Sequence, residues 1–201
     1  MKSRFVLASR SPRRYELLKQ LGFEIDIVPS RIEENLIEGE SPEDHVLRLA
    51  EAKASEVGSR FPTRWVIAAD TIVYIDHSIL GKPKTQGEAI EMLQVLSGRE
   101  HWVLTGFSVQ NIEKGKKGRE AVKTAVKMKP LSPVEIDWYV STKEPFDKAG
   151  GYAIQGIGSF MVESIRGSYT NVVGLPLCEL MEMLVRLGAI SISESGLRIS
   201  D

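Results

Sequence analysis

Cysteine is almost absent from this sequence, with Cys178 alone among 201 residues. One cysteine excludes an intrachain disulfide and a cysteine metal cluster, and it is typical of a reducing compartment. Long apolar runs are missing as well, because none approaches the roughly 20 residues that a membrane-spanning helix needs. The N-terminus leads into a strand pattern without the features of a signal peptide. We therefore expect a cytoplasmic protein with no membrane partner.

An excess of either charge is also missing. Lysine plus arginine number 26 and aspartate plus glutamate 27, so the formal net charge is −1. Without a basic field we expect no nucleic-acid partner. The basic segment 114–119 has no interleaved aromatic residues and predicts an exposed hairpin loop. His45, His77 and His101 lack metal-ligand spacing, so we expect them at surface or edge positions.

Helix and strand patterns alternate along the chain, which predicts a mixed α/β fold in one domain, 1–201. Three helices are expected to begin at Ser-Pro pairs, since serine caps a helix and proline suits its first position. The polar segment 189–201 is expected to be a flexible tail. Expected helices cover 12–21, 42–58, 86–97, 133–140 and 177–187, and expected strands cover 5–8, 23–27, 65–75, 101–109, 122–128 and 160–165.

The first Ser-Pro helix carries arginines where the other two carry acids. Arg13 and Arg14 follow Ser11-Pro12, although the positive end of a helix dipole favours anions. One interpretation is a phosphate site built from backbone N–H groups, the Ser9 and Ser11 hydroxyls, and Arg10 or Arg13. The alternative is that the arginines turn to solvent or pair with distant carboxylates, and this segment alone does not decide.

Two charged residues interrupt apolar patterns further along. Lys53 lies on the apolar face of the 42–58 helix, where it must either snorkel to an edge, the commoner outcome, or reach a negatively charged site. Asp70, followed by Thr71, interrupts the apolar strand 65–75, so it must be paired, metal-bound or at a strand break. A structural aspartate bonded to a loop is the alternative. A turn at 76–78 would return Lys82 along this strand toward Asp70.

A glycine-rich segment, 144–158, follows the third Ser-Pro helix. Its backbone amides and Gln155 could bind the edge of a planar base. It matches neither a dinucleotide fingerprint nor a Walker A loop, and composition alone favours a simple connector.

Taken together, the short motifs of this chain resemble the Maf family of nucleotide pyrophosphatases. They follow one another in order over nearly the whole sequence, and as a set they are highly specific. The motifs are Ala8-Ser9-Arg10-Ser11-Pro12-Arg13-Arg14, Ala69-Asp70-Thr71, Gly81-Lys82-Pro83, Glu144-Pro145 with Asp147-Lys148-Ala149-Gly150, Ile154-Gln155-Gly156, and Val173-Gly174-Leu175-Pro176.

The resemblance implies an elongated mixed β-sheet flanked by helices, in two lobes around a cleft, as in inosine triphosphate pyrophosphatases. It implies hydrolysis of a nucleoside triphosphate to the monophosphate and pyrophosphate with a divalent cation, Mg²⁺ or Mn²⁺. The motifs at 147–150 and 154–156 resemble the branch that acts on dTTP and UTP. The alternatives are the 7-methyl-GTP branch and a nucleotide-binding regulator of septum formation. The resemblance also makes a homodimer plausible.

Residue roles follow from the resemblance at matching positions. Asp70 corresponds to the proton acceptor, and Arg13, Thr71 and Gln155 correspond to positions linked to substrate selection. We add to these a metal site at Asp70 and Glu33. Charge neutralisation of the triphosphate is assigned to Arg13, Lys53, Lys82 and the loop of Ser9 and Ser11.

Overall fold

The computed structural model describes residues 5–193 and 196–199. The chain divides into two compact units, each made of separate stretches of sequence. The first unit comprises Met1–Asp70, Thr105–Ala121 and Gly174–Asp201, and the second comprises Thr71–Leu104 and Val122–Val173. The expected arrangement of two lobes around a cleft stays a prediction.

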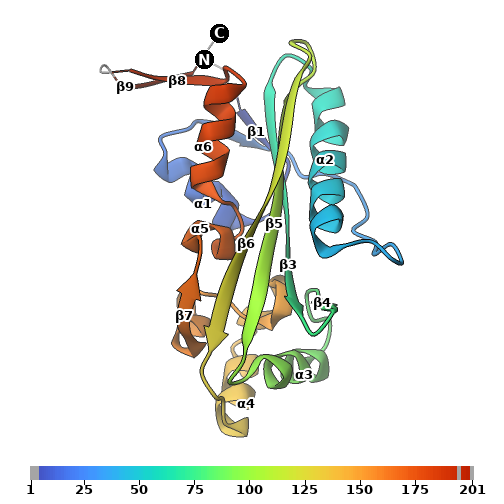
Figure 1. Cartoon of the computed structure of the whole chain (residues 1–201), viewed down its shortest axis with the longest axis vertical. Helices are drawn as coiled ribbons and strands as arrows, with labels where there is room; N and C mark the ends of the chain where they lie inside the picture. The colour runs from blue at the N-terminus through green and yellow to red at the C-terminus, as the bar shows by residue number, and fades with distance from the viewer. Residues whose placement is uncertain (1–4, 194–195, 200–201) are drawn as a thin grey trace. The chain divides into compact units, whose positions relative to one another are not determined.

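Helices and strands alternate as the sequence predicts (Figure 1). The helices are α1 (Pro12–Gln20), α2 (Pro42–Arg60), α3 (Gln86–Leu96), α4 (Pro133–Ser141), α5 (Tyr169–Val173) and α6 (Leu177–Arg186), with 3-10 turns η1 (Glu144–Asp147), η2 (Ala149–Gly151) and η3 (Gly156–Met161). The strands are β1 (Phe5–Leu7), β2 (Ile25–Ile27), β3 (Trp65–Ile75), β4 (Ser78–Leu80), β5 (Glu100–Asn111), β6 (Lys116–Met128), β7 (Val162–Arg166), β8 (Ile190–Ser193) and β9 (Gly196–Ile199).

Seven strands form one mixed sheet, which confirms the predicted α/β class. Its order is β2-β1-β3-β5-β6-β7, and β4 pairs with β3 outside this path. In the first unit β1 pairs in parallel with both β2 and β3, with Phe5 opposite Ile25 and Trp65. In the second unit β3 pairs with β4, and β6 with β7, in antiparallel fashion. Parallel strands need long connections, and antiparallel neighbours can be joined by short turns, which explains why the sequence has both connecting helices and tight hairpins.

The first unit has its own apolar core between α2 and two parallel strands. Ala54 and Val57 of α2 pack against Val6 of β1 and against Val66 and Ala68 of β3. In Figure 1, α2 lies on one side of the strands of this unit, and α1 and α6 lie on the other. The core therefore fixes the face of α2 that carries Lys53.

A glycine brings α2 close to the sheet. A Cβ on Gly106 of β5 would lie 2.5 Å from the backbone carbonyl carbon of Val46 in α2. Real Cβ atoms do not approach backbone so closely, so a side chain at Gly106 would push α2 away. The depth of α2 on the sheet, and with it the reach of Lys53, depends on this close approach.

The second unit packs α3 and α4 against its antiparallel strands. Its core contains Leu93 of α3, Tyr139 of α4 and Val73 of β3. A two-residue turn at Asp76 and His77, with φ of 47° and 62°, closes the β3–β4 hairpin as the sequence predicts.

Local sequence misplaces two histidines and misses one helix. Two of the histidines expected at the surface are buried, His45 at 4% and His101 at 1% exposed. His45 Nδ1 lies 3.0 Å from Glu40 Oε2, and His101 Nε2 lies 2.6 Å from the Tyr152 hydroxyl, while His101 Nδ1 has no hydrogen-bond partner among the described residues. The helix α5 was not expected, since its Thr-Asn-Val-Val sequence is rich in β-branched residues; the Ser168 hydroxyl, which accepts from the Asn171 N–H at 3.2 Å, supports its first turn. In the segment 189–201, β8 and β9 pair with each other. Residues 194–195 and 200–201 of this segment lie outside the described part, and the expected flexibility of the segment stays a prediction.

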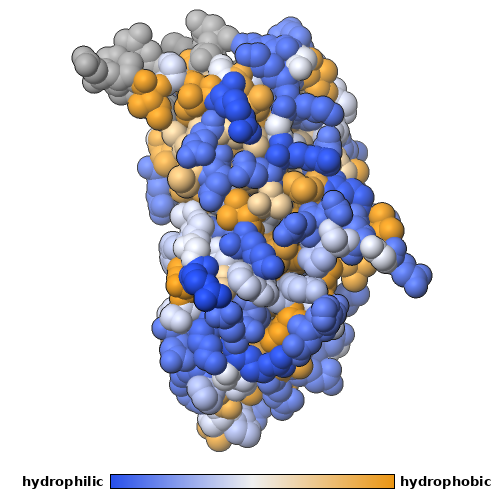
Figure 2. All heavy atoms as spheres, in the orientation of Figure 1, coloured by the Kyte–Doolittle hydropathy of each residue, from blue (hydrophilic) through white to orange (hydrophobic). Residues whose placement is uncertain are grey.

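No helix in the described part of the chain combines the length and the apolar character needed to cross a membrane. Figure 2 shows polar side chains over most of the visible face, with apolar side chains scattered among them.

Candidate functional site

The start of α1 differs from the starts of the other Ser-Pro helices. Ser11 caps the helix by accepting from the Arg14 backbone N–H at 3.5 Å, and no acidic residue occupies the first turn. By contrast, α2 has Glu43 and Asp44 there, and α4 has a complete capping box with Glu135. The positive end of the helix dipole and the cationic side chains at this end of α1 suit an anion.

The arginine that turns inward is Arg14. Its Nε donates to the Gly174 carbonyl oxygen at 2.8 Å, and its Nη1 donates to Ser9 Oγ at 3.1 Å. Burial lowers the pKa of Arg14, and the nearby negative charges of Asp70 and Glu34 partly offset this effect. Arg14 therefore joins the start of α1 to the turn before α6, and it lies within the electrostatic reach of two carboxylates.

A buried lysine lies between two carboxylates in the same unit. Lys53 Nζ donates to Asp70 Oδ1 at 2.6 Å and to Glu34 Oε1 at 2.6 Å. The Lys53 and Asp70 side chains are 8% and 9% exposed, whereas Glu34 is 49% exposed. Burying one lysine and one aspartate is tolerable because each satisfies the other, and Glu34 connects the pair to solvent.

Sheet and helix geometry explain why Lys53 meets Asp70. Val66, Ala68 and Asp70 alternate along β3 and share the face that packs on α2. Lys53 is four residues before Val57 on the buried stripe of α2, so it points to that same face. The lysine on the apolar face of the helix and the aspartate in the apolar strand are therefore partners of each other.

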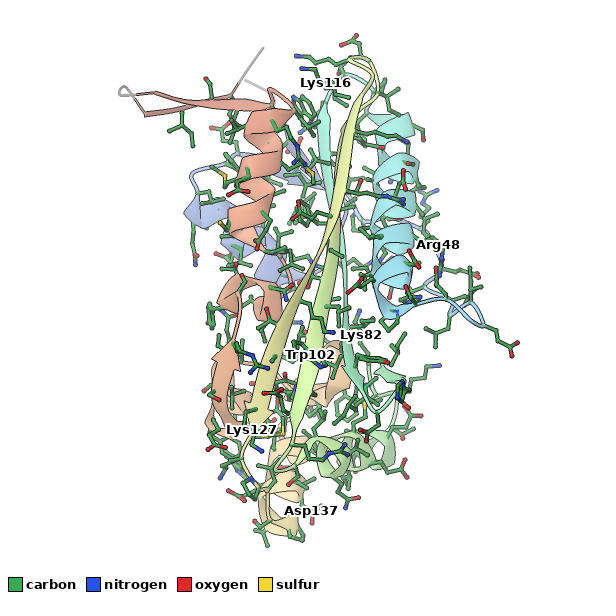
Figure 3. All side chains as sticks on the ribbon, in the orientation of Figure 1. Arg48, Lys82, Trp102, Lys116, Lys127 and Asp137 are labelled. Carbon is green, nitrogen blue, oxygen red and sulfur yellow. The ribbon has the colours of Figure 1, made fainter. Side chains whose placement is uncertain are left out.

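The loop from 29 to 40 supplies Glu34 and is tied to α2. Arg48 reaches from α2 to this loop, donating to Glu40 at 2.6 and 2.7 Å and to the Asn35 carbonyl at 3.0 Å (Figure 3). The hydrogen bond from Arg48 lowers the pKa of Glu40 to about 2. Within this loop the Glu33 carboxylate accepts from the Asn35 side chain at 3.1 Å and is exposed, so Glu34, and not Glu33, meets Lys53 beside Asp70.

The carboxylates of this cluster fit a divalent cation of the magnesium type. Mg²⁺ and Mn²⁺ prefer carboxylate oxygens, and Mg²⁺ commonly uses one or two of them together with substrate phosphates. Asp70 and Glu34 each place an oxygen 2.6 Å from the same nitrogen, so the two oxygens are at most twice that distance apart. Among the described residues no group of three or more histidine, cysteine, aspartate or glutamate side chains could hold a metal ion. The assignment of Glu33 as a ligand stays untested.

In the second unit, two of the sequence motifs contact each other. The Gly150 N–H, at φ of 69°, donates to the Gly81 carbonyl at 2.9 Å. A Cβ on Gly150 would lie 2.9 Å from a methyl carbon of Val73, so only glycine fits there. These contacts fix the backbone before Lys82, whose side chain is exposed and makes no ion pair within the described residues (Figure 3).

A single carboxylate organises the glycine-rich loop that carries Gln155. Glu144 accepts from the Ile157 N–H at 3.1 Å, the Gly158 N–H at 2.9 Å and the Tyr139 hydroxyl at 3.0 Å. Burial raises the pKa of Glu144, but these hydrogen bonds outweigh it and hold the pKa below its usual value. Gln155 itself is partly exposed, and its side chain makes no hydrogen bond to another described residue. The loop is thus a defined structure that presents an amide.

Beneath the same loop lies a buried histidine. His101 Nε2 is 2.6 Å from the Tyr152 hydroxyl, and its ring meets the Tyr152 ring edge-on. Burial lowers the pKa of His101 to about 4 and raises that of Tyr152 above its usual value, so both are neutral at pH 7.

The structure brings together some of the predicted residues and adds three others. Asp70 and Lys53 meet directly, and Ser9 and Ser11 share the start of α1 with the partly exposed Arg13. Thr71, Lys82 and Gln155 belong to the second unit. Sequence reasoning missed the roles of Arg14 and Glu34 in the first unit and of Glu144 in the second.

Fold and charged cluster together define a mixed α/β protein suited to a phosphate compound and a divalent cation. In the comparison with known families, the model described as Maf-like protein matches residues 4–187. The chain belongs to the Maf family.

Curated relatives cover almost the whole chain. The dTTP/UTP pyrophosphatase of Syntrophus aciditrophicus is 49% identical over 190 residues, which are 94% of this chain and 93% of that protein. The dTTP/UTP pyrophosphatase of Geotalea uraniireducens is 51% identical over 189 residues, 94% of this chain and 97% of that protein. Among solved structures, the Ham1 protein of Staphylococcus aureus matches 79% of each chain with a TM-score of 0.42 and 15% identity.

Proposed function

We propose that this protein hydrolyses dTTP and UTP to the nucleoside monophosphate and pyrophosphate, as a house-cleaning activity. The observation that carries the proposal is the Lys53 ammonium shared by Asp70 and Glu34, in a chain about half identical to proteins named dTTP/UTP pyrophosphatase. Carboxylates that could orient water and bind a cation, beside cations that could bind phosphates, are the parts this reaction needs.

Water is the nucleophile in the proposed reaction. Its oxygen bonds to the α-phosphorus while the bond from that phosphorus to the bridging oxygen breaks, and pyrophosphate leaves with the bonding electrons. Asp70 accepts the proton of the water. Lys53 holds the Asp70 carboxylate in place and, with Arg13 and the Ser9 and Ser11 loop, offsets the charge on the triphosphate.

Asp70 and Glu34 would hold the divalent cation, Mg²⁺ or Mn²⁺. When bound, the cation supplies Lewis-acid polarisation of phosphate oxygens and lowers the pKa of water. We retain Glu33 as the neighbouring candidate, so Glu33→Gln and Glu34→Gln should be compared for the metal concentration that gives half-maximal activity. A larger increase for Glu34→Gln is expected.

Base selection is assigned to Gln155, with Thr71 and Arg13 at positions that also affect it. A side-chain amide can offer a donor and an acceptor to the edge of a pyrimidine. A mismatched base would leave a buried polar group unpaired, which is why such a site can discriminate strongly. Lys82 is assigned to charge neutralisation of the phosphates.

The test is the release of pyrophosphate from a panel of nucleoside triphosphates, with Mg²⁺, with Mn²⁺ and with chelator. Metal-dependent turnover with the highest kcat/KM for dTTP and UTP is expected. A preference for 7-methyl-GTP would move the protein to the other branch. Tight nucleotide binding without turnover would instead favour a regulator of septum formation. Localisation in the cytoplasm and a homodimer remain predictions, and light scattering measures the latter.

A further inference from the structure

The hydroxyl of Ser9 accepts two hydrogen bonds from its own chain. Ser9 Oγ receives the Ser11 backbone N–H at 3.1 Å and the Arg14 Nη1–H at 3.1 Å. A serine hydroxyl has two acceptor lone pairs and one donor proton. Both donors are N–H groups that cannot act as acceptors, so the Ser9 proton must point away from them.

The Ser9 proton finds no acceptor among the residues that the structure describes. Ser9 is 8% exposed, so its hydroxyl is nearly buried and an unmade hydrogen bond there would be costly. The hydroxyl is at the start of α1, whose first turn contains no acidic residue that could receive the proton. An acceptor from outside the described residues, such as a phosphate oxygen, would satisfy it.

Arg14 fixes the direction of this proton. Its Nε donates to the Gly174 carbonyl at 2.8 Å, so the guanidinium is held at two points and cannot follow a rotating hydroxyl. Donation from a cation also polarises the Ser9 O–H, which strengthens the hydrogen bond that the hydroxyl gives. Without Arg14, one lone pair of Ser9 Oγ would lose its donor, and the proton could rotate into that direction.

We propose that Arg14 is a positioning residue, which acts through Ser9 by forcing the Ser9 hydroxyl to donate to a phosphate oxygen of the substrate. The inference deepens the proposed function and rests on it for the identity of the substrate. Arg13 keeps its separate assignment to direct substrate contact.

A double-mutant cycle tests the coupling. The full chain, Ser9→Ala, Arg14→Lys and the double variant are compared for kcat/KM with dTTP and the required metal. Each single change should lower kcat/KM about 10- to 100-fold, the range of one hydrogen bond to a charged group. The kcat/KM of the double variant should lie within about twofold of that of the less active single variant, because the two changes remove the same interaction. Effects that multiply would overturn the proposal.

A matched cycle separates positioning from general support of the fold. Arg64 lies in the same unit and also donates to a backbone carbonyl, that of Phe5 at 2.7 Å, but it does not contact Ser9. In the double variant of Arg64→Lys and Ser9→Ala, the factors by which the two single changes lower kcat/KM should multiply. Melting temperatures of all variants check the fold, and Arg14→Gln replaces Arg14→Lys if the latter does not fold.

Binding of inorganic triphosphate, measured by calorimetry with the same variants, keeps the two proposals apart. If no nucleoside triphosphate is hydrolysed by the unaltered protein, the proposed function fails. The coupling between Ser9 and Arg14 is then judged from the dissociation constants for inorganic triphosphate. Absence of coupling in these constants, or no binding of inorganic triphosphate at all, would overturn the inference.

Discussion

Lys53 Nζ and Asp70 Oδ1 lie 2.6 Å apart, and both side chains are more than nine-tenths buried. Neither charge could remain in this core alone, so each side chain is the reason that the other is tolerated. The half-exposed Glu34 adds a second carboxylate to the same ammonium. The same two side chains therefore serve both the stability of the core and the proposed reaction.

Replacing Lys53 tests the dependence of the core on the pair. Lys53→Met leaves the Asp70 carboxylate buried without its ammonium, and should lower the free energy of unfolding by about 3–5 kcal/mol in urea titrations. Lys117→Met is the control, because Lys117 is exposed and 3.4 Å from Glu51, and should cost less than about 1 kcal/mol. Adding Asp70→Asn to Lys53→Met should recover part of the loss. Equal stability of Lys53→Met and the unaltered protein would contradict a tightly coupled pair.

Replacing Asp70 tests its chemical role. Asp70→Asn keeps the shape of the side chain but cannot accept a proton, so turnover should fall by a factor of about 10² to 10⁴ or more. Binding of a triphosphate should stay measurable by calorimetry, since Arg13 and Lys53 remain. Full activity of this variant would remove Asp70 from the mechanism.

Replacing Arg13 tests direct substrate contact at the start of α1. Arg13 is partly exposed, so Arg13→Ala should leave the melting temperature nearly unchanged. Loss of a charge-assisted contact should raise KM or reduce the preference for dTTP by about tenfold. Steady-state kinetics with the nucleotide panel measure both. An unchanged kinetic profile would return Arg13 to the surface role that the sequence left open.

Glu144 should affect selectivity without touching the base. Glu144→Gln turns an amide toward the Ile157 and Gly158 N–H groups, which need acceptors, so the Gln155 loop should loosen. The ratio of kcat/KM for dTTP to that for dCTP should fall about tenfold. Glu135→Gln removes another glutamate bonded to backbone and should change stability alone. An unaltered ratio for Glu144→Gln would show that the loop does not set selectivity.

His101 should make stability depend on pH between about 4 and 6.5. The folded protein keeps this imidazole neutral down to its lowered pKa of about 4, whereas the unfolded chain takes up the proton near 6.5. Unfolding therefore becomes easier as pH falls through this window, by about 3 kcal/mol in all, and His101 adds no dependence above it. The measurement is urea unfolding at several pH values.

Substitution separates His101 from other titrating groups. His101→Phe should flatten the dependence, and His77→Asn should retain it, because His77 is exposed and asparagine tolerates its φ of 62°. If the stability of His101→Phe depends on pH as that of the unaltered protein does, groups other than His101 cause the dependence.

Periodicity predicted much of the scaffold, but Arg14 was not singled out from the sequence. Leu17 and Leu18 are the buried residues of α1. Arg14 is three residues before Leu17 and four before Leu18, so it lies at the middle of that face, and helical spacing could have identified it. Arg13 lies at the edge of the same face.

No comparable signal distinguished Glu33 from Glu34. Both lie in an irregular loop, where adjacent side chains follow no fixed period. The loop conformation depends on Arg48 bonds to Glu40 and Asn35, across many residues of chain. Asp70 and Lys53, by contrast, were identifiable because each broke a regular apolar pattern.

The division of the chain between Asp70 and Thr71 has an evolutionary consequence. Three of the four points where the chain changes unit fall inside β3, β5 and β6, and the fourth precedes Gly174. A single recombination event in the gene would therefore cut through both cores at once. Because each unit consists of separate stretches of sequence, neither can be exchanged as one contiguous piece of chain.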